Sequence, residues 1–97
     1  MTTIKILDLV GSFAENKDVA RDLRTQKILP SMEKNENIIF DFGGVETTTQ
    51  SFVHALISDT IRTRGIDQFI GKTEFKNCND SVKKIINIVV DYMQAPD

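Results

Sequence analysis

The chain has 97 residues, an apolar share of 40%, a charged share of 27% and a formal net charge of −2. These values are typical of a folded domain, because a disordered chain has fewer apolar residues and a higher net charge. They also argue against a nucleic-acid partner, which requires a clustered positive surface. We therefore expect one domain over residues 1–97.

The cysteine and histidine content limits which covalent links and metal sites the chain can form. The chain has one cysteine, Cys78, and one histidine, His54, which excludes an internal disulfide and the usual zinc ligand sets. We expect no metal site and no cofactor. No segment approaches the roughly 18 apolar residues of a membrane-spanning helix, and the first residues lack the pattern of a secretory signal. The sequence predicts a cytoplasmic protein without membrane contact.

The first third of the chain predicts a strand followed by a long helix. Residues 3–10 (TIKILDLV) are rich in isoleucine and leucine and end at Gly11, a pattern that favours a strand. Residues 16–34 carry apolar positions at helical spacing among many charges, with Asn16 as the expected N-cap. Because proline lacks a backbone donor, Pro30 should end or kink this helix near Leu29. Residues 31–36 should then form a turn or loop.

The middle of the chain predicts a buried strand, a loop and a second helix. Residues 38–40 (IIF) form a continuous apolar run, which is typical of a central strand covered on both faces. Two glycines at 43 and 44 end that strand, and residues 47–49 (TTT) favour a loop or a helix cap. Helical spacing of apolar residues runs from Gln50 to Arg64, and Gly65 is a natural stop.

The last third predicts one more strand and the final helix. Residues 68–76 (QFIGKTEFK) indicate a third strand, interrupted or bulged at Gly71. Asn79 or Asp80 is the expected N-cap of the final helix, and Pro96 should close it. The apolar residues of this helix recur at amphipathic spacing: Val82, Ile85, Ile86, Val89, Val90 and Met93.

Strands therefore alternate with helices along the chain. This order predicts an α/β fold: a single small layered domain in which a mostly parallel sheet of three to four strands packs with helices through right-handed crossovers. Open α/β sheets bind ligands and partners at the carboxyl ends of their strands. The segment from Asp41 to Ser51 follows the central strand, so we expect the binding surface there.

Two motifs resemble the STAS-like family of small bacterial domains, which are relatives of the anti-sigma-factor antagonists. The first is the strand and turn of residues 38–45 (IIFDFGGV), and the second is Ser51-Phe52, six residues after Val45 at a helix start. The likeness extends to the strand, Asn-rich turn and helix around residues 75–82 (FKNCNDSV). The resemblance implies a STAS-like fold and a protein-binding surface.

The same resemblance suggests a regulatory role for one serine. In the anti-sigma-factor antagonists, a serine at this strand-to-helix junction is phosphorylated by an ATPase-type kinase that is also the binding partner. Counting from Val45, Ser51 takes that position. The chain departs from the antagonists at Thr49, where they usually carry aspartate, and at Phe52, where they usually carry glycine. The resemblance thus implies phosphorylation of Ser51 and a histidine-kinase-like ATPase as the partner.

Residues around this junction allow both structural and functional interpretations. Ser51 either caps the helix through its hydroxyl or is a modified or partner-contacting serine. Asp41 either bonds the amide of Gly43 or Gly44 in a turn, which we favour, or contacts a partner or metal at the sheet edge. His54 shares a helical face with Ser51, which leaves a Ser/His-dependent hydrolase as a lesser alternative.

Three further residues also allow more than one interpretation. Phe13 and Phe42, near strand ends, are candidates for a partly exposed contact patch, although Phe42 can instead close the core. Cys78 precedes a helix start, which can lower the pKa of a thiol, but its neighbours resemble no catalytic site. We interpret Cys78 as an incidental thiol.

The sequence therefore predicts a non-enzymatic, protein-binding regulatory module of the anti-sigma-factor-antagonist type. A small structural subunit that forms homo-oligomers is the alternative. The predicted partner-binding residues surround Ser51 in the chain and are Asp41, Phe42, Gly43, Gly44, Glu46, Thr47, Thr48, Thr49, Gln50 and His54.

Overall fold

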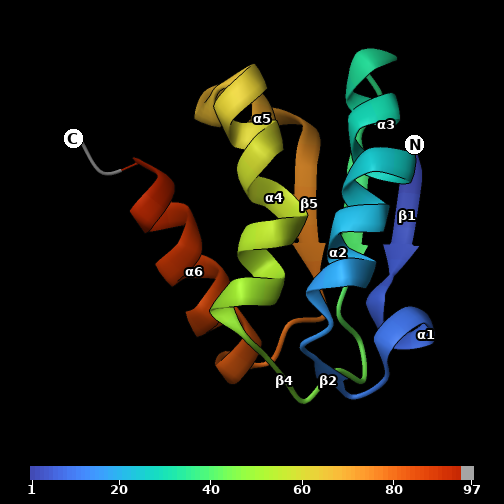
Figure 1. The fold of residues 1–97 in the computed structure, drawn as a ribbon, viewed down its shortest axis with the longest axis vertical. Coiled ribbons are helices and arrows are strands. Elements are labelled where there is room, and N and C mark those ends of the chain that lie inside the picture. The colour runs from blue at the N-terminus through green and yellow to red at the C-terminus, as the bar shows by residue number, and fades with distance from the viewer. Residues whose placement is uncertain (95–97) are drawn as a thin grey trace.

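A three-stranded parallel sheet forms one layer of the computed structural model, which describes residues 1–94 (Figure 1). Its strands are β1 (Thr2–Lys5), β3 (Ile38–Asp41) and β5 (Thr73–Lys76), in the order β1-β3-β5. Thr2 of β1 and Thr73 of β5 both pair with Ile38, so the three strands start and end level with one another. The prediction of a small α/β domain with a mostly parallel sheet is confirmed.

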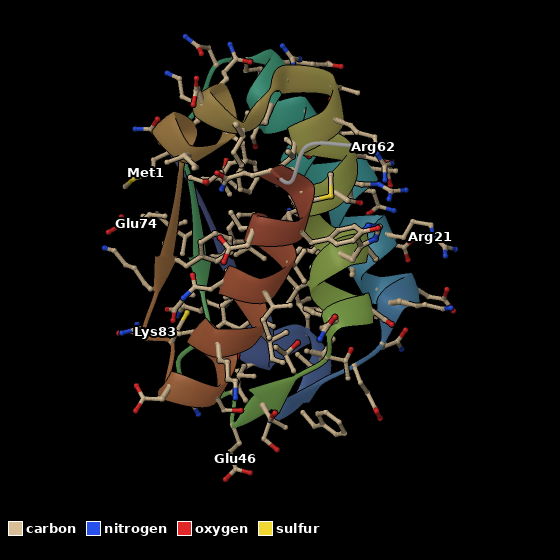
Figure 2. The ribbon with its side chains drawn as sticks, turned by 90° about the vertical axis from the view of Figure 1, so that its left-hand side faces the viewer. Met1, Arg21, Glu46, Arg62, Glu74 and Lys83 are labelled. Atoms are coloured by element: carbon tan, nitrogen blue, oxygen red, sulfur yellow. The ribbon has the colours of Figure 1, made fainter. Side chains whose placement is uncertain are left out.

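All the main helices lie on one side of this sheet (Figures 1 and 2). The segment α2 (Lys17–Leu23), η1 (Arg24–Ile28) and α3 (Leu29–Glu33) connects β1 to β3. The helices α4 (Gln50–Arg64) and α5 (Ile66–Lys72) connect β3 to β5, and α6 (Asp80–Gln94) follows. Crossovers of one hand that progress in one direction along a sheet return on the same side, which leaves the other face open.

Side-chain burial follows from this one-sided arrangement. Ile4 and Phe40 are buried in the core, whereas Lys5 and Glu74 are exposed, and Glu74 points to the open face of the sheet (Figure 2). The prediction that the central strand is covered on both faces is therefore wrong. The side chain of Ile39 is nevertheless only 8% exposed, because the residues that pair with it on β1 and β5 flank it on both sides.

The strand predicted over residues 3–10 is shorter than expected. Lys5 pairs with Asp41, the last residue of β3, so the chain beyond Lys5 loses its partner strand. Backbone groups need partners, and here a short helix, α1 (Ile6–Val10), supplies them. The N–H of Gly11 donates to the carbonyl oxygen of Leu7 at 2.9 Å and ends that helix.

Helical structure continues through Pro30, so of the two predicted outcomes near Leu29, an end or a kink, the end is wrong. The π-helical turn η1 lies directly ahead, and Pro30 occupies the first turn of α3. Proline fits at a helix start because its missing N–H needs no partner there. The turn predicted over residues 31–36 is wrong for residues 31–33. Ser31 is helical and buried, and its hydroxyl shares a hydrogen bond with that of Thr2 at 3.0 Å.

The third strand is also shorter than predicted. Residues 68–72 belong to α5, and β5 contains only residues 73–76, which pair with β3. Ile66, Phe69 and Ile70 follow the i, i+3, i+4 spacing of a helix, and Phe69 is buried. Gly71 lies within α5 and marks no bulge.

A second, two-stranded sheet aligns the starts of two helices. β2 (Phe13–Ala14) pairs in parallel with β4 (Thr47–Thr48), where the sequence predicted a loop or cap. An N-cap residue follows each strand closely: Thr49 of α4 comes directly after β4, and Asn16 of α2 comes two residues after the end of β2. The small sheet therefore brings the N-termini of α2 and α4 to the same end of the molecule (Figure 1).

The last helix packs as its periodicity predicts. Val82, Ile86 and Val89 are buried, and the remaining members of the predicted stripe, Ile85, Val90 and Met93, are partly buried against the core. Removing such side chains from water contributes about 1.5–3 kcal/mol for each one fully buried. Pro96, the predicted end of the helix, lies outside the described residues.

Candidate functional site

The loop after β3 is held in a defined turn by Asp41. Its Oδ1 accepts hydrogen bonds from the backbone N–H of Gly43 at 2.8 Å and from Nδ2 of Asn77 at 3.0 Å. The hydrogen bond from Asn77, followed by that from Gly43, lowers the pKa of the Asp41 carboxyl, since both donors favour the ionised form. The turn interpretation of Asp41 is confirmed.

The start of α6 fixes the rest of this loop. Nδ2 of Asn79 donates to the carbonyl oxygens of Val45 at 3.4 Å and Glu46 at 2.9 Å. Oδ1 of Asn79 accepts from the backbone N–H of Val82 at 2.8 Å, which confirms the predicted N-cap. One asparagine thus joins the loop to the final helix. These hydrogen bonds hold the segment from Asp41 to Glu46 in place at the carboxyl end of the sheet.

Three large apolar side chains are exposed at the same end of the molecule. Leu7 is 38% exposed, Leu9 48% and Phe13 46%, and they come from α1 and β2. Leu7 lies against Gly44, where an added Cβ would be 2.7 Å from its Cδ2 atom. We call the group Leu7, Leu9, Phe13, Gly44 and Glu46 the loop-end surface.

Two of the predicted partner-binding residues do not reach the surface. The ring of Phe42 is fully buried, 6.3 Å from that of Phe75 between centroids, so Phe42 closes the core. Thr48 is buried as well, and its hydroxyl donates to the carbonyl oxygen of Ala14 at 2.7 Å. Both are corrected from contact residues to structural ones.

Ser51 is exposed and does not cap its helix. The N-cap of α4 is Thr49, whose Oγ1 accepts from the backbone N–H of Phe52 at 3.1 Å. Ser51 is the second residue of the helix, and its hydroxyl makes no hydrogen bond to the described residues. The capping interpretation of Ser51 is therefore wrong, and the hydroxyl is accessible for chemistry or contact.

Ser51 also lies at one end of a groove of about 610 Å³ that runs over the outer side of α4. The helix α4 forms its floor, α2 with η1 forms one wall, and α6 forms the other. We call this the α4 groove. Its lining residues are Lys17, Arg21, Arg24, Gln50, Ser51, His54, Ala55, Ser58, Asp59, Arg62, Ile88, Val89 and Tyr92.

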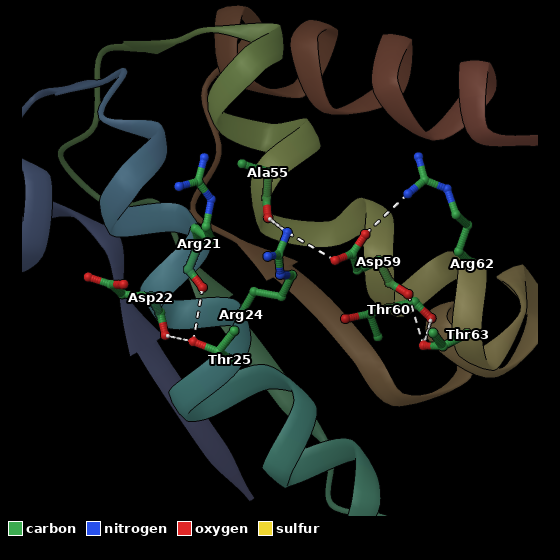
Figure 3. A network of polar contacts seen from close by, with 9 residues as sticks. All are labelled: Arg21, Asp22, Arg24, Thr25, Ala55, Asp59, Thr60, Arg62 and Thr63. Atoms are coloured by element: carbon green, nitrogen blue, oxygen red, sulfur yellow. Dashed lines mark hydrogen bonds and ion pairs between the residues drawn. The ribbon is translucent and has the colours of Figure 1, made fainter.

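Positive charge gathers in the α4 groove, although the whole chain carries a net charge of −2. Asp59 is the acidic residue among the lining residues of the described chain, and its carboxylate bridges Arg24 at 3.2 Å and Arg62 at 3.1 Å (Figure 3). The guanidinium of Arg24 also donates to the carbonyl oxygen of Ala55 at 3.4 Å. Arg21 and Arg62 project on the helical side of the molecule, away from Glu74 on the open sheet face (Figure 2).

The groove does not assemble a serine-hydrolase triad. Ser51 and His54 line it together, but the carboxylate of Asp59 is engaged by two arginines and does not orient the imidazole. Cys78 lies elsewhere, in the turn before α6, and burial raises the pKa of its thiol. A raised pKa keeps the thiol protonated near neutral pH, which is the opposite of an activated nucleophile.

The predicted site residues fall into two groups. Asp41, Gly43, Gly44, Glu46 and Thr47 lie at the carboxyl end of the sheet. Gln50, Ser51 and His54 line the α4 groove, and Thr49 caps the helix between the two regions.

Sequence reasoning missed the walls of this groove and the exposed leucines of α1. A usable signal was present, because Lys17, Arg21 and Arg24 stand at i, i+4 and i+7 and so share one helical face.

Within residues 1–94, no group of three histidine, cysteine or acidic side chains could hold a metal ion. No helix in this described part of the chain has both the length and the apolar character needed to cross a membrane.

Comparison with known proteins gives one match. Residues 19–83, about two thirds of the chain, match the model of a family described as a STAS-like domain of unknown function (DUF4325). The matched segment extends from the first turn of α2 to the start of α6 and so includes the central strand, the loop after it and Ser51. No curated protein and no solved structure shows significant similarity to the chain.

Proposed function

The chain belongs to the STAS-like domain family, and we propose that it is a non-enzymatic regulatory module whose loop-end surface binds a protein partner and whose Ser51 regulates that binding when phosphorylated. The accessible hydroxyl of Ser51 carries the proposal. Thr49 performs the capping, so the Ser51 hydroxyl is left exposed and makes no hydrogen bond to the described residues.

The loop-end surface supports a protein partner. Leu7, Leu9 and Phe13 expose apolar area that would gain from removal from water, at about 25 cal/mol per Å². The neighbouring loop is already ordered by Asn77 and Asn79, so binding would cost little conformational entropy. An apolar patch beside a preformed polar loop has the composition of a protein interface.

The position of Ser51 supports regulation by phosphate. A phosphoryl group there would add a charge of about −1.5 to −2 at the positive end of α4. Lys17 and Arg21, which line the same groove, could pair with it. The added charge would lie four residues along the chain from Thr47, which pairs with Phe13 of the loop-end surface. The family's likeness to anti-sigma-factor antagonists favours an ATPase of the histidine-kinase-like superfamily as the partner and kinase.

A photo-crosslinking experiment in the source cells tests the partner surface. One variant carries benzoylphenylalanine in place of Phe13, and a matched variant carries it in place of Ile70. Both positions are exposed apolar residues, but Ile70 lies on α5 at the opposite end of the sheet. We expect a discrete protein adduct from position 13 and none from position 70.

The captured protein then allows the regulatory part to be tested. Its affinity for wild type, Ser51→Ala and Ser51→Glu is measured by titration, and intact mass shows whether it phosphorylates the domain. We expect at least tenfold weaker binding for Ser51→Glu and unchanged binding for Ser51→Ala. Equal adducts from positions 13 and 70 would refute the claim that the loop-end surface is the partner-binding site. A self-adduct from position 13 would support the homo-oligomeric subunit instead, and three equal affinities would refute the switch.

A further inference from the structure

We propose that the α4 groove is a docking site for an acidic amphipathic helix of a protein partner. This surface is separate from the loop-end surface and needs no modification of Ser51. Docking is expected of the unmodified protein, because a phosphoryl group on Ser51 would compete with the acidic helix for Lys17 and Arg21.

The charges of the groove have the spacing of a helix. Lys17, Arg21 and Arg24 lie at i, i+4 and i+7 along one wall, so their positive groups repeat at intervals of about one 5.4 Å turn. Carboxylates at the same spacing on a bound helix would meet Lys17 and Arg21, and the third would approach Arg24, which is already paired with Asp59 at 3.2 Å. Lys17 and Arg21 are exposed at the rim, and Arg21 has a weak partner in Asp18 at 3.5 Å. Both are therefore free to change partner.

The opposite wall is apolar. Ile88, Val89 and Tyr92 of α6 face the groove, and Ile88 and Tyr92 are exposed large side chains. Ala55 and Ser58 on the floor are small and would allow a second backbone to approach closely. A helix with acidic residues on one side and leucine or phenylalanine on the other would satisfy both walls at once. This is the helix-in-groove mode of recognition.

The length of the groove favours a helix over a single small anion. Ser51 and Arg62 are eleven residues apart on α4, which corresponds to about 16 Å or three helical turns. A lone phosphate would contact one part of this length and leave the apolar wall unused. A nucleic acid is also disfavoured, because the acidic remainder of the chain would repel a longer polyanion.

The test uses a fluorescein-labelled 14-residue helical peptide with glutamates at positions 1, 5, 8 and 12 and leucines on the adjacent face. Its anisotropy is titrated with the full chain, and a matched peptide carries glutamine in place of every glutamate. The test variant is Lys17→Glu with Arg21→Glu. The control variant is Lys83→Glu with Lys84→Glu, which makes the same change of charge on an exposed part of α6 outside the groove.

We expect micromolar binding that weakens at least tenfold in the test variant and less than twofold in the control variant. The Lys17→Ala, Arg21→Ala variant should weaken binding severalfold. It provides a second test if the charge-reversal variant does not fold. Equal binding of the glutamate and glutamine peptides, or no binding of either, would overturn the proposal. Tighter binding of ADP or of a twelve-nucleotide poly(dT) through the same two residues would also overturn it and would assign the groove to phosphates.

Discussion

The loop-end surface and the α4 groove are built by different interactions. The loop-end surface is fixed by hydrogen bonds between side-chain amides and backbone groups, chiefly those of Asn77 and Asn79, and what it exposes is apolar. The α4 groove is formed by side chains from three helices, and what it exposes on one wall is positive charge. A preformed apolar surface favours affinity, whereas a charged groove favours selection among partners. The two could therefore be altered separately by mutation.

The largest expected effect on stability compares two ion pairs: Arg24–Asp59, which is partly buried in the groove, and Arg21–Asp18, which is exposed at its rim. Asp59→Asn removes the carboxylate from Arg24, whose side chain is 17% exposed and whose Nε has no partner among the described residues. We expect a loss of about 2 kcal/mol in unfolding free energy, less than the about 3–5 kcal/mol of a fully buried pair because Asp59 is 41% exposed. Asp18→Asn breaks the exposed pair with Arg21 and should cost no more than about 0.5 kcal/mol. Urea denaturation of both variants measures the difference, and equal losses would contradict it.

The second test addresses the rigidity of the loop-end surface. Gly44 has a φ of +81°, and a Cβ there would lie 2.7 Å from Cδ2 of Leu7. Gly44→Ala should therefore destabilise the domain by about 1–2 kcal/mol, since strain and displacement of Leu7 both contribute. Gly71→Ala is the control, because Gly71 is helical with open space around it and alanine should stabilise it by up to about 1 kcal/mol. The thermal unfolding temperature should fall for Gly44→Ala and rise for Gly71→Ala. An undiminished unfolding temperature for Gly44→Ala would contradict the prediction and show that the loop and Leu7 shift without loss of stability.

The third test compares two hydroxyl residues at the border between the two regions. Thr49→Ala removes the N-cap of α4 and should cost about 1 kcal/mol. Ser51→Ala should change stability by less than about 0.5 kcal/mol, because its hydroxyl makes no hydrogen bond to the described residues. Chemical denaturation of the two variants checks this. A larger loss from Ser51→Ala than from Thr49→Ala would return Ser51 to a structural role.

The smallest expected effect is a change of pH dependence at the loop. The pKa of Asp41 is lowered in the folded protein, so its contribution to stability is present above the unfolded pKa of about 3.9 and is lost as pH falls through the lower folded pKa. Asn77→Ala removes the main cause and should raise the Asp41 pKa toward its ordinary value. Carbon-detected NMR titration of the carboxyl measures this pKa in both proteins. An unchanged pKa in Asn77→Ala would show that the Gly43 amide alone controls it.

Local features of this fold could be predicted because they depend on neighbouring residues. The caps at Asn16 and Asn79 and the Asp41 turn each involve residues within three positions of one another, and the stripe of α6 lies within one continuous helix. The sequence predicts strands for residues 6–10 and 68–72, because their apolar residues suit a strand as well as a helix. In the structure both segments are helical, since β3 pairs only with residues 2–5 and 73–76. Where β3 ends relative to these segments is set by residues some thirty positions away in the chain.

The candidate site was predictable in part for the same reason. The sequence located the Asp41–Ser51 segment and the resemblance singled out Ser51. The sequence left open whether Ser51 or a residue of 47–49 caps the helix and whether Phe42 is exposed or closes the core, and the structure shows that Thr49 is the cap and that Phe42 is buried. The facing walls of the α4 groove come from residues 17–24 and 88–92, at opposite ends of the chain. No local pattern joins them.

The amino-acid sequence by itself determined the alternation of strands and helices, the caps at Asn16 and Asn79 and the family to which the chain belongs, because hydrogen bonds and periodicity within a few residues encode them. The tertiary structure alone decided that the helices share one face of the sheet, that Leu7 and Leu9 are exposed, and that four cations gather over α4 in an acidic chain. Those properties depend on which distant segments meet, and that is settled by burial of the whole apolar surface at once.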